Sequence, residues 1–348
     1  MSNEILTLTA YFTERERTND RFLADEMLDL FHDRGIAASV LLRGIAGFGV
    51  TNVALSDRSL SLAEDASVTI TAVDHPERIL ALTDPVAAMT NRGVITLQRG
   101  HELTNDLPGA QPAHPGNVRL SLYLGRKQRV AGRPGYIAVC EVLHRNGFVG
   151  AEVLLGVDGT VAGQRRRARF FSSNTDVPQL VAGVGTVDQT AAAVEELRGM
   201  LTDPLYTVEQ ILVCKVGGQK LADPRELTGS GPIQKLTVRT AEDTLSGGQP
   251  IHRELIQRLK DSDHASGATV LRGIWGYLGA ERPHGDRFPH LARHVPVSTV
   301  IVDTAPNIAA SYAIVDELTE HDGLVTCEVV PRMLALHDGH SVGSLRLD

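Results

Sequence analysis

The sequence predicts an α+β fold in which one β-α-β-β-α-β unit occurs three times in tandem. Two observations predict it: one segment recurs far along the chain in a single register, and each third of the chain has the same order of predicted strands and helices. The chain has 348 residues, 42% of them hydrophobic, which is enough for two or three domains with apolar cores.

The recurring segment reads VLLRGIAGFG at residues 40–49 and TVLRGIWGYLG at residues 269–279. Placing Gly44 on Gly273 gives an offset of 229 (273 minus 44), and this offset holds without a gap into the next predicted strand. A weaker copy, VLLGVDG, lies at residues 153–159 with an offset of 112 (156 minus 44). We therefore expect three copies, of which the second has diverged.

The order of elements is clearest in the first copy. Alternating, β-prone segments predict strands, and apolar residues three or four positions apart predict helices, the first of which should end at Gly35. Strands are expected at residues 5–12, 39–45, 67–73 and 93–99, and helices at 18–35 and 75–91. Segments rich in Pro and Gly separate the copies. The expected divisions are repeat 1 at 1–103, a linker at 104–116, the diverged repeat 2 at 117–219, a linker at 220–233, repeat 3 at 234–336 and a tail at 337–348.

This order of elements is that of the ferredoxin-like fold, in which two helices cover one face of a four-stranded antiparallel sheet. The other face of each sheet must be buried by something else. Three separate units would leave three apolar sheet faces in water. We therefore expect a monomeric pseudo-trimer in which the three sheets face inward around a pseudo-threefold axis.

Composition excludes some classes of function. The formal net charge is −8 and the sequence pI is near 5.9, so a nucleic-acid-binding protein is not expected. No stretch of apolar residues is long enough to span a membrane, and no secretory signal is visible at the N-terminus. Cys140, Cys214 and Cys327 are far apart and odd in number, as expected for reduced thiols in a cytoplasmic protein.

The motif LRGIxGxG lies at Leu42–Gly49 and begins again at Leu271–Gly276, and a long loop and a strand ending in Val-Asp follow each copy. In this motif the chain resembles the PII-like superfamily, and it is most similar to a bacterial branch designated a domain of unknown function. The resemblance covers most of the first and third copies. In the second copy it is limited to element order and glycine placement.

PII-like proteins are typically homotrimers of ferredoxin-like units that bind ligands, often adenine nucleotides, between subunits and contact a partner through a mobile loop. The resemblance therefore implies a signalling protein that binds a small anionic ligand or a nucleotide in three clefts. It implies contact with a protein partner through loops at 46–66, 158–178 and 275–295, and a membrane transporter such as a fluoride channel as that partner. The Gly- and Lys-rich phosphate-holding loop of PII proteins is absent here, which counts against ATP.

Glycines beside arginines are the first candidate ligand-binding residues. A glycine turn at a strand end can leave backbone N–H groups free to hold an anion, and here such turns recur next to arginine. The alternative is a tight exit from the strand that requires positive φ. The candidates are Arg43, Gly44, Gly47, Gly49, Arg272, Gly273 and Gly276.

Basic residues at strand ends and in loops are the second group of candidates. Arg or Lys at the end of the last strand of each copy would suit a phosphate or carboxylate group in each cleft, although charge at a strand end also protects sheet edges. These residues are Arg99, Lys215 and Arg332, at offsets of 116 (215 minus 99) and 117 (332 minus 215). Matching loop positions hold Arg58, Arg169 and Arg287, and the second loop adds Arg165, Arg166 and Arg167. These loop arginines suit either an anionic contact surface or a solvated loop.

Metal and catalytic sites are not expected. His284, His290 and His294 are spaced by six and four residues, but no carboxylate or cysteine completes a recognisable metal-ligand spacing. His337 and His340 lie apart in the tail. No signature of a catalytic nucleophile, P-loop or metalloprotease is present, so the chain is predicted to be neither an enzyme nor dependent on a cofactor. The alternative to an effector-binding regulator is a structural adaptor module whose clefts are filled by side chains.

Overall fold

The computed structural model describes most of the chain. The described residues are 3–49, 66–103, 116–167, 176–202, 204–262, 264–285 and 294–347, together with the backbone of 55–56. Among them, no helix combines the length and the apolar character that crossing a bilayer requires.

The first segment contains four long strands and two helices. Its main elements are β1 (Glu4–Thr13), α1 (Leu23–Asp33), β4 (Ala38–Phe48), β6 (Ser67–Asp74), α2 (Pro76–Met89) and β7 (Arg92–Glu102). The short strands are β2 (Arg17–Thr18), β3 (Arg21–Phe22) and β5 (Leu55–Ser56). Helix α1 begins later than expected because β2 and β3 pair with each other just before it. Its buried face is made by Leu23, Met27, Leu28 and Phe31, which follow helical spacing.

The second segment has the same order of main elements. They are β8 (Asn117–Gly125), α3 (Gly135–Arg145), β11 (Gly150–Leu155), β14 (Pro178–Thr186), α4 (Val187–Arg198) and β15 (Leu205–Val216). The short strands are β9 (Arg129–Val130), β10 (Arg133–Pro134), β12 (Asp158–Val161), β13 (Gln164–Arg165) and β16 (Gln219–Lys220). A capping box starts α4: the Thr186 hydroxyl accepts from the Gln189 N–H, and the Gln189 side chain accepts from the Thr186 N–H.

The third segment repeats the order again and adds a hairpin. Its main elements are β17 (Ile233–Ala241), α5 (Ile251–Asp261), β20 (Ala268–Arg272), β23 (Pro296–Thr304), α6 (Ala305–Leu318) and β24 (Leu324–Val329). The remaining elements are the 3₁₀ helix η1 (Pro224–Ser230), β18 (Leu245–Ser246), β19 (Gln249–Pro250), β21 (Trp275–Leu278), β22 (His284–Gly285), β25 (Arg332–His337) and β26 (His340–Ser344).

The strands do not form three separate four-stranded sheets. Most of them belong to one sheet of 20 strands, in which strands of different segments hydrogen-bond directly. Nine of them close into an antiparallel barrel in the order β1-β6-β4-β20-β23-β17-β24-β15-β7 and back to β1. The prediction of a pseudo-trimer of ferredoxin-like units with inward-facing sheets is therefore wrong.

The physical reason lies at the strand edges. A separate four-stranded sheet leaves N–H and C=O groups unpaired along both outer strands, and such groups seek partners. Here β4 pairs with β20, β15 pairs with β24, and β15 also pairs with β7, so that every pair of segments shares a ladder. Joining these edges satisfies backbone groups that three isolated sheets would expose.

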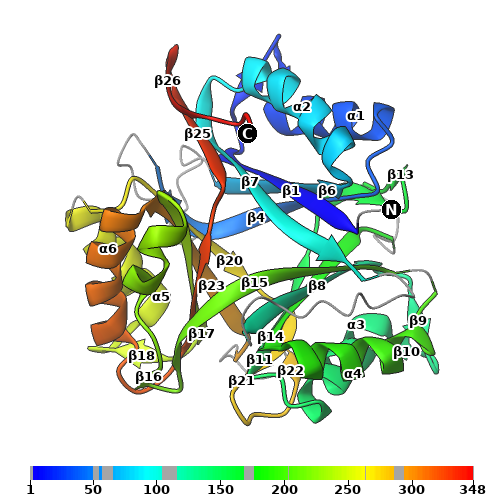
Figure 1. Ribbon diagram of the computed structural model, residues 1–348, viewed down its shortest axis with the longest axis vertical. Coiled ribbons are helices and arrows are strands. Elements are labelled where there is room, and N and C mark those ends of the chain that lie inside the picture. The colour runs from blue at the N-terminus through cyan, green and yellow to red at the C-terminus, as the bar shows by residue number, and fades with distance from the viewer. Residues whose placement is uncertain are drawn as a thin grey trace.

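Helices cover the outside of the strands as three pairs (Figure 1). α1 with α2, α3 with α4, and α5 with α6 lie around the periphery, while the strands occupy the centre. Each pair packs on a hydrophobic cluster of its own, as Leu28 and Ile79 do in the first segment, Leu143 and Val194 in the second, and Leu255 in the third. Apolar burial is therefore concentrated between helices and sheet.

The predicted linkers and tail are partly structured. Residues 104–115 of the first linker lie outside the described residues. The second linker, 220–233, contains η1, which starts with a capping box between Asp223 and Glu226. The tail continues a hairpin, because β25 pairs with β7 and β26 pairs with β25. Leu345 is buried against the first segment's core, so the C-terminal residues are part of the fold.

Candidate functional site

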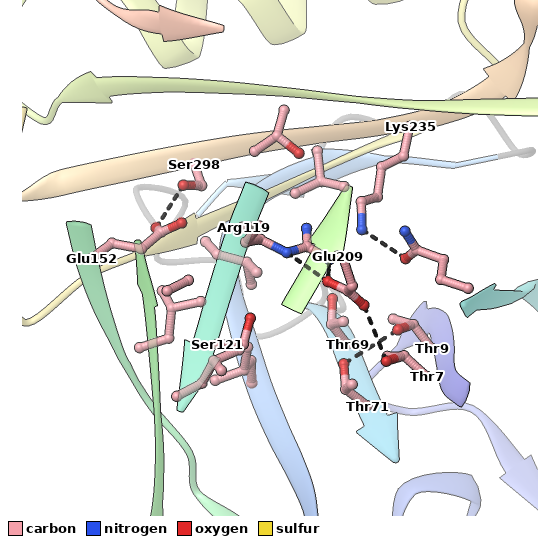
Figure 2. A pocket seen from close by; sticks show the side chains of 18 of the residues that line it. Thr7, Thr9, Thr69, Thr71, Arg119, Ser121, Glu152, Glu209, Lys235 and Ser298 are labelled. Carbon is pink, nitrogen blue, oxygen red and sulfur yellow. Dashed lines mark hydrogen bonds and ion pairs between the residues drawn. The ribbon is translucent and has the colours of Figure 1, made fainter. Parts of the chain in front are cut away.

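The three segments meet around a small polar cavity inside the sheet. Figure 2 shows its lining side chains, which come from strands of all three segments. Its volume is about 90 Å³. A cavity of that size holds a few water molecules or a small ion, whereas pockets for larger organic ligands occupy roughly 300–1,000 Å³.

The lining follows from strand alternation, because every second side chain of each segment's first strand points inward. Thr7 on β1 lies opposite Gln98 on β7. At the same register position of the second segment, Arg119 on β8 lies opposite Glu209 on β15. In the third segment, Lys235 on β17 lies opposite Glu328 on β24. Each segment thus contributes one facing pair, neutral in the first and charged in the other two.

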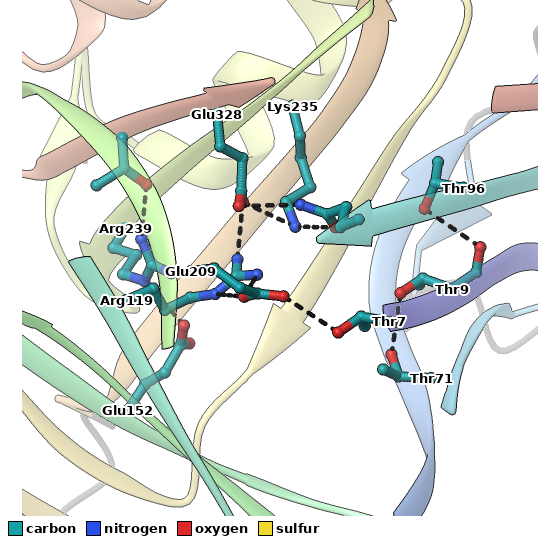
Figure 3. Close-up of polar contacts among 12 residues, drawn as sticks. Thr7, Thr9, Thr71, Thr96, Arg119, Glu152, Glu209, Lys235, Arg239 and Glu328 are labelled. Carbon is teal, nitrogen blue, oxygen red and sulfur yellow. Dashed lines mark hydrogen bonds and ion pairs between the residues drawn. The ribbon is translucent and has the colours of Figure 1, made fainter. Parts of the chain in front are cut away.

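These six residues form a ring that runs from each segment to the next (Figure 3). The Thr7 hydroxyl donates to Glu209 at 3.1 Å, Arg119 donates to Glu328 at 2.8 Å, and the Lys235 ammonium donates to Gln98 at 2.7 Å. Within segments, Arg119 Nε donates to Glu209 at 2.8 Å, and Lys235 Nζ lies 2.7 Å from Glu328. Gln98 also donates to Glu328 at 2.9 Å, and its position opposite Thr7 on the neighbouring strand brings the two ends of this chain of contacts together. We call these six side chains the polar ring.

A second charged pair lies beside the polar ring. Arg239 on β17 donates to Glu152 on β11 at 2.8 Å, and Ser298 on β23 donates to the other oxygen of Glu152 at 2.6 Å. Arg239 also donates to the Thr326 hydroxyl. This pair joins the second segment to the third and is almost completely buried.

Three cations and two carboxylates line the cavity, and a third carboxylate, Glu328, contacts Arg119 and Lys235 from behind the lining. Burial alone would raise the pKa of the Glu328 carboxyl, but the cations Arg119 and Lys235 outweigh burial and lower it. The pKa of the Lys235 ammonium is lowered, mainly by burial and then by the nearby Arg119. Burial raises the pKa of the Tyr11 hydroxyl, which also lines the cavity, so this group stays protonated. Pairing therefore favours the charged form of Glu328, whereas burial disfavours the charged form of Lys235.

The predicted glycine site is used for strand packing. A Cβ on Gly47 would come within 2.6 Å of the Ala268 carbonyl oxygen, and one on Gly276 within 2.3 Å of the Ala151 carbonyl oxygen. One on Gly44 would meet Ser67. The N–H of Gly273 donates to the Pro296 carbonyl, so it does not offer the free group that an anion nest needs. Around Gly49 there is open space.

The arginines next to these glycines lie outside the cavity lining. Arg43 forms an ion pair with Glu14 at 2.5 Å and is more than half exposed. Arg272 lies 2.9 Å from the Glu242 carboxylate. The structure therefore does not bring Arg43 and Arg272 to the polar cavity where the three segments meet.

The three basic residues expected at equivalent strand ends are not equivalent. Gln98, Glu209 and Glu328 share a register position, so the residues that correspond to Arg99 are Gln210 and Val329. The expected equivalence is therefore wrong.

Each of those basic residues has its own partner instead. Arg99 pairs with Glu4 at 3.2 Å, and the Lys215 ammonium is buried against Asp316 at 2.7 Å. Arg332 donates to the Arg346 carbonyl oxygen. Arg58, Arg169 and Arg287 lie outside the described residues.

The arginine run of the second segment joins that segment to the first. Arg165 is paired with Asp158 at 2.9 Å in its own segment and with Asp29 on α1 of the first. Arg167 reaches Asp25 on the same helix at 2.9 Å. Arg166 pairs with Asp176. All three side chains are held by acidic partners rather than forming a basic surface, and Arg165 and Arg167 form an intersegment contact.

The candidate histidines separate into two places. His284 and His294 come together, and Glu281 lies within ligand distance of both, a carboxylate that sequence spacing did not single out. His290 lies outside the described residues. His337 and His340 face each other across the β25–β26 hairpin.

The polar ring itself was missed by the sequence analysis. Its signal was present as charged residues inside otherwise alternating strands: Arg119 in VRLSLYL and Lys235 in KLTVRTA, where Arg239 gives the same signal for the neighbouring pair with Glu152. A charge at an inward strand position is rarely left without a partner, which makes such residues candidates for a buried network.

The comparisons with known proteins agree with the three segments. The sequence model of the DUF190 family, described as Uncharacterized ACR, COG1993, matches residues 5–101, 117–213 and 233–332. The chain belongs to the DUF190 family. The matches confirm three tandem repeats and place the polar ring in all three, since Thr7 and Gln98, Arg119 and Glu209, and Lys235 and Glu328 each fall within one match. Among solved structures, the crystal structure of aspartate kinase from Synechocystis aligns with a TM-score of 0.25 and 11% identity over 99% of this chain, and the chain spans 46% of that protein.

Proposed function

We propose that this DUF190 chain is a non-enzymatic regulatory adaptor of the PII-like kind, which contacts a protein partner through its surface loops. The polar ring is the observation that carries the proposal. It surrounds the place where the three segments meet with side chains that satisfy one another, and the cavity left there, about 90 Å³, is too small for a nucleotide. A fully satisfied buried network makes a rigid core, which suits a module that presents loops to a partner.

The resemblance to PII-like proteins supplies the partner class for this proposal, a membrane transporter such as a fluoride channel, met at the cytoplasmic side. A direct measurement is co-sedimentation of the purified chain with vesicles that contain a purified fluoride channel, compared with vesicles of the same lipid without it. If the chain is an adaptor for this channel, it should sediment with the vesicles that contain the channel and not with the vesicles that lack it. Equal sedimentation with both kinds of vesicle would exclude the channel as the partner.

A second candidate is a regulator that binds a small inorganic anion in the cavity. Arg119, Lys235 and Arg239 line the cavity, and the buried Thr69 hydroxyl, which also lines it, lacks a hydrogen-bond partner in the structure. The volume of about 90 Å³ favours phosphate, sulfate or fluoride over a nucleotide in this cavity. A nucleotide would have to bind elsewhere, for example beside Arg43 and Arg272.

A thermal-shift screen separates the two candidates. A ligand that binds the folded chain at 100 times its dissociation constant adds about 2.7 kcal/mol of stability. The adaptor predicts no shift with nucleotides, cyclic nucleotides, phosphate, sulfate or fluoride. A shift with an inorganic anion that is lost in Thr69→Val would support binding in the cavity. A nucleotide shift that is lost when Arg43 and Arg272 are both changed to Ala would support the predicted glycine–arginine site and overturn the adaptor.

A further inference from the structure

Three side chains of the third segment lie together in a manner typical of metal ligands. Glu281 and His284 follow β21, and His294 precedes β23; one ligand atom from each lies within 4.8 Å of the others. His294 Nε2 and Glu281 Oε2 are 3.3 Å apart. Tetrahedral ligands about 2.0–2.2 Å from zinc lie roughly 3.3 Å from one another, so this pair already has the required spacing.

The hydrogen bonds of the two imidazoles leave the right atoms for a metal. His294 Nδ1 lies 2.5 Å from Asp243 Oδ1, and His284 Nδ1 lies 2.8 Å from the Arg282 carbonyl oxygen. A carbonyl can only accept, so His284 Nδ1 carries the hydrogen and Nε2 keeps its lone pair. The carboxylate of Asp243 acts in the same way on His294. Metal-bound histidines almost always have such an outer partner on the second ring nitrogen.

The local fold holds these residues in place. His284 lies on β22, which pairs with β21 through Gly276 opposite His284. The Glu242 N–H donates to the Val295 carbonyl. This backbone hydrogen bond holds Asp243, the residue after Glu242, near His294, the residue before Val295. The two imidazole rings are nearly parallel, with centroids 5.0 Å apart. Residues from the end of β17, from the β21–β22 turn and from the start of β23 therefore converge.

Part of this arrangement can be explained without a metal ion. A protonated His294 between Asp243 and Glu281 would form two ion pairs at the same distances. That explanation does not involve His284, whose ring is stacked on His294 and would repel it if both were charged. With both rings neutral, the two imidazoles and the Glu281 carboxylate form a donor set that suits Zn²⁺ and that includes His284.

We propose that Glu281, His284 and His294 bind a zinc ion, with Asp243 as a positioning residue that orients His294 and a water molecule as the fourth ligand. The first segment does not repeat the site: the positions of Glu281 and His284 at the offset of 229 are Asn52 and Leu55, which cannot supply the same ligands. The ion connects the β21–β22 turn to the start of β23, and so stabilises the folded chain by mass action.

Isothermal titration of the metal-free full chain with Zn²⁺ tests the proposal. One ion per chain is expected, together with a higher melting temperature. His284→Ala, His294→Ala and Glu281→Gln should each abolish stoichiometric binding, and Asp243→Asn should weaken it by about 10–100-fold, the usual effect of losing an outer partner. His337→Ala is the matched control, because it removes an exposed imidazole outside the site, and it should leave affinity unchanged.

Cobalt gives a second readout that does not depend on stability. Co²⁺ in the site should show the intense visible absorption of a tetrahedral ion, and this absorption should disappear in His284→Ala. The proposal is overturned if the wild-type chain binds no stoichiometric zinc. It is equally overturned if binding survives both His284→Ala and His294→Ala, or is lost in His337→Ala. None of these outcomes decides the adaptor, whose tests measure sedimentation with a channel and the binding of anions or nucleotides rather than the binding of zinc.

Discussion

Arg119 on β8 donates a 2.8 Å hydrogen bond to Glu328 on β24, although the two residues belong to different repeats. The same guanidinium also pairs with Glu209, so one cation serves two carboxylates whose side chains are 5% exposed or less. Burial alone would lower the pKa of Arg119, but the two glutamates outweigh it and raise that pKa. Removing any one partner would leave a buried charge uncompensated, and the stability of the centre therefore depends on complete pairing.

Lys235→Thr should be strongly destabilising. The change removes one of the two cations that pair with Glu328 and the donor to Gln98, and breaking a buried ion pair from one side typically costs about 3–5 kcal/mol. Urea denaturation followed by circular dichroism measures the change in unfolding free energy. Arg92→Ala is the control, since it breaks the Arg92–Asp338 pair on an exposed hairpin, where about 1 kcal/mol or less is expected.

The first repeat suggests how the loss can be recovered. It uses the neutral Thr7 and Gln98 where the third uses Lys235 and Glu328. The double variant Lys235→Thr with Glu328→Gln should therefore be more stable than Lys235→Thr alone, because the single variant leaves Arg119 to balance two buried ring carboxylates, Glu209 and Glu328. A double-mutant cycle gives the coupling energy between the two positions. Additive losses would show that the two side chains do not act as a pair.

The acid sensitivity of the fold should depend on Glu328. Its pKa is lowered in the folded state because Arg119 and Lys235 outweigh the effect of burial. A carboxyl with a depressed folded pKa contributes stability above its unfolded pKa, about 4.3, and loses it as pH falls through the folded pKa.

Unfolding free energies measured from pH 7 to pH 3 test this expectation. Wild type should lose more stability over that range than Glu328→Gln, so the gap between the two should narrow as pH falls. A gap that stays constant would mean that the Glu328 carboxyl titrates alike in the folded and unfolded chains.

Arg165→Ala should weaken the contact between the first two repeats. Arg165 is only 16% exposed and links Asp158 to Asp29 on α1. Charge-assisted hydrogen bonds contribute roughly 1.5–3 kcal/mol each, so a loss in that range is expected, and added salt should reduce it only in part. Arg133→Ala, which breaks an exposed pair with Glu141 inside the second repeat, is the matched control. Similar losses in both variants would contradict a special role for the intersegment cluster.

How far the sequence determines the fold can be judged from particular residues. The repeat that relates Gly44 to Gly273 can be recognised in the sequence because close approach of the strands requires glycine at both positions. The barrel leaves no such trace. It depends on β4 pairing with β20 and β15 with β24, and backbone hydrogen bonds between strand edges use groups that every residue carries.

The candidate site was predicted poorly for a related reason. Arg99 and Lys215 were aligned by an offset of 116, whereas the strand register relates Gln98 to Glu209 at an offset of 111 (209 minus 98). Linkers and loops differ in length between repeats, so an offset that fits one element misplaces the next. The polar ring and the Glu281–His284–His294 cluster both join residues whose proximity depends on that register and on turn geometry.

Gly47→Ala and Gly49→Ala should differ sharply, and the difference separates the two interpretations of these glycines. A methyl group at residue 47 would lie 2.6 Å from the Ala268 carbonyl oxygen on the neighbouring strand β20, and backbone atoms in a ladder cannot move aside cheaply. Overpacking of this kind costs about 1–3 kcal/mol. At residue 49 a methyl group meets nothing within 4 Å, so its effect on the unfolding free energy should be close to zero. An anion nest predicts a different result: both variants would keep most of their stability, and both would lose the thermal shift that a bound anion produces. Chemical denaturation of the two variants, with and without phosphate, therefore decides whether these glycines serve strand packing or ligand binding.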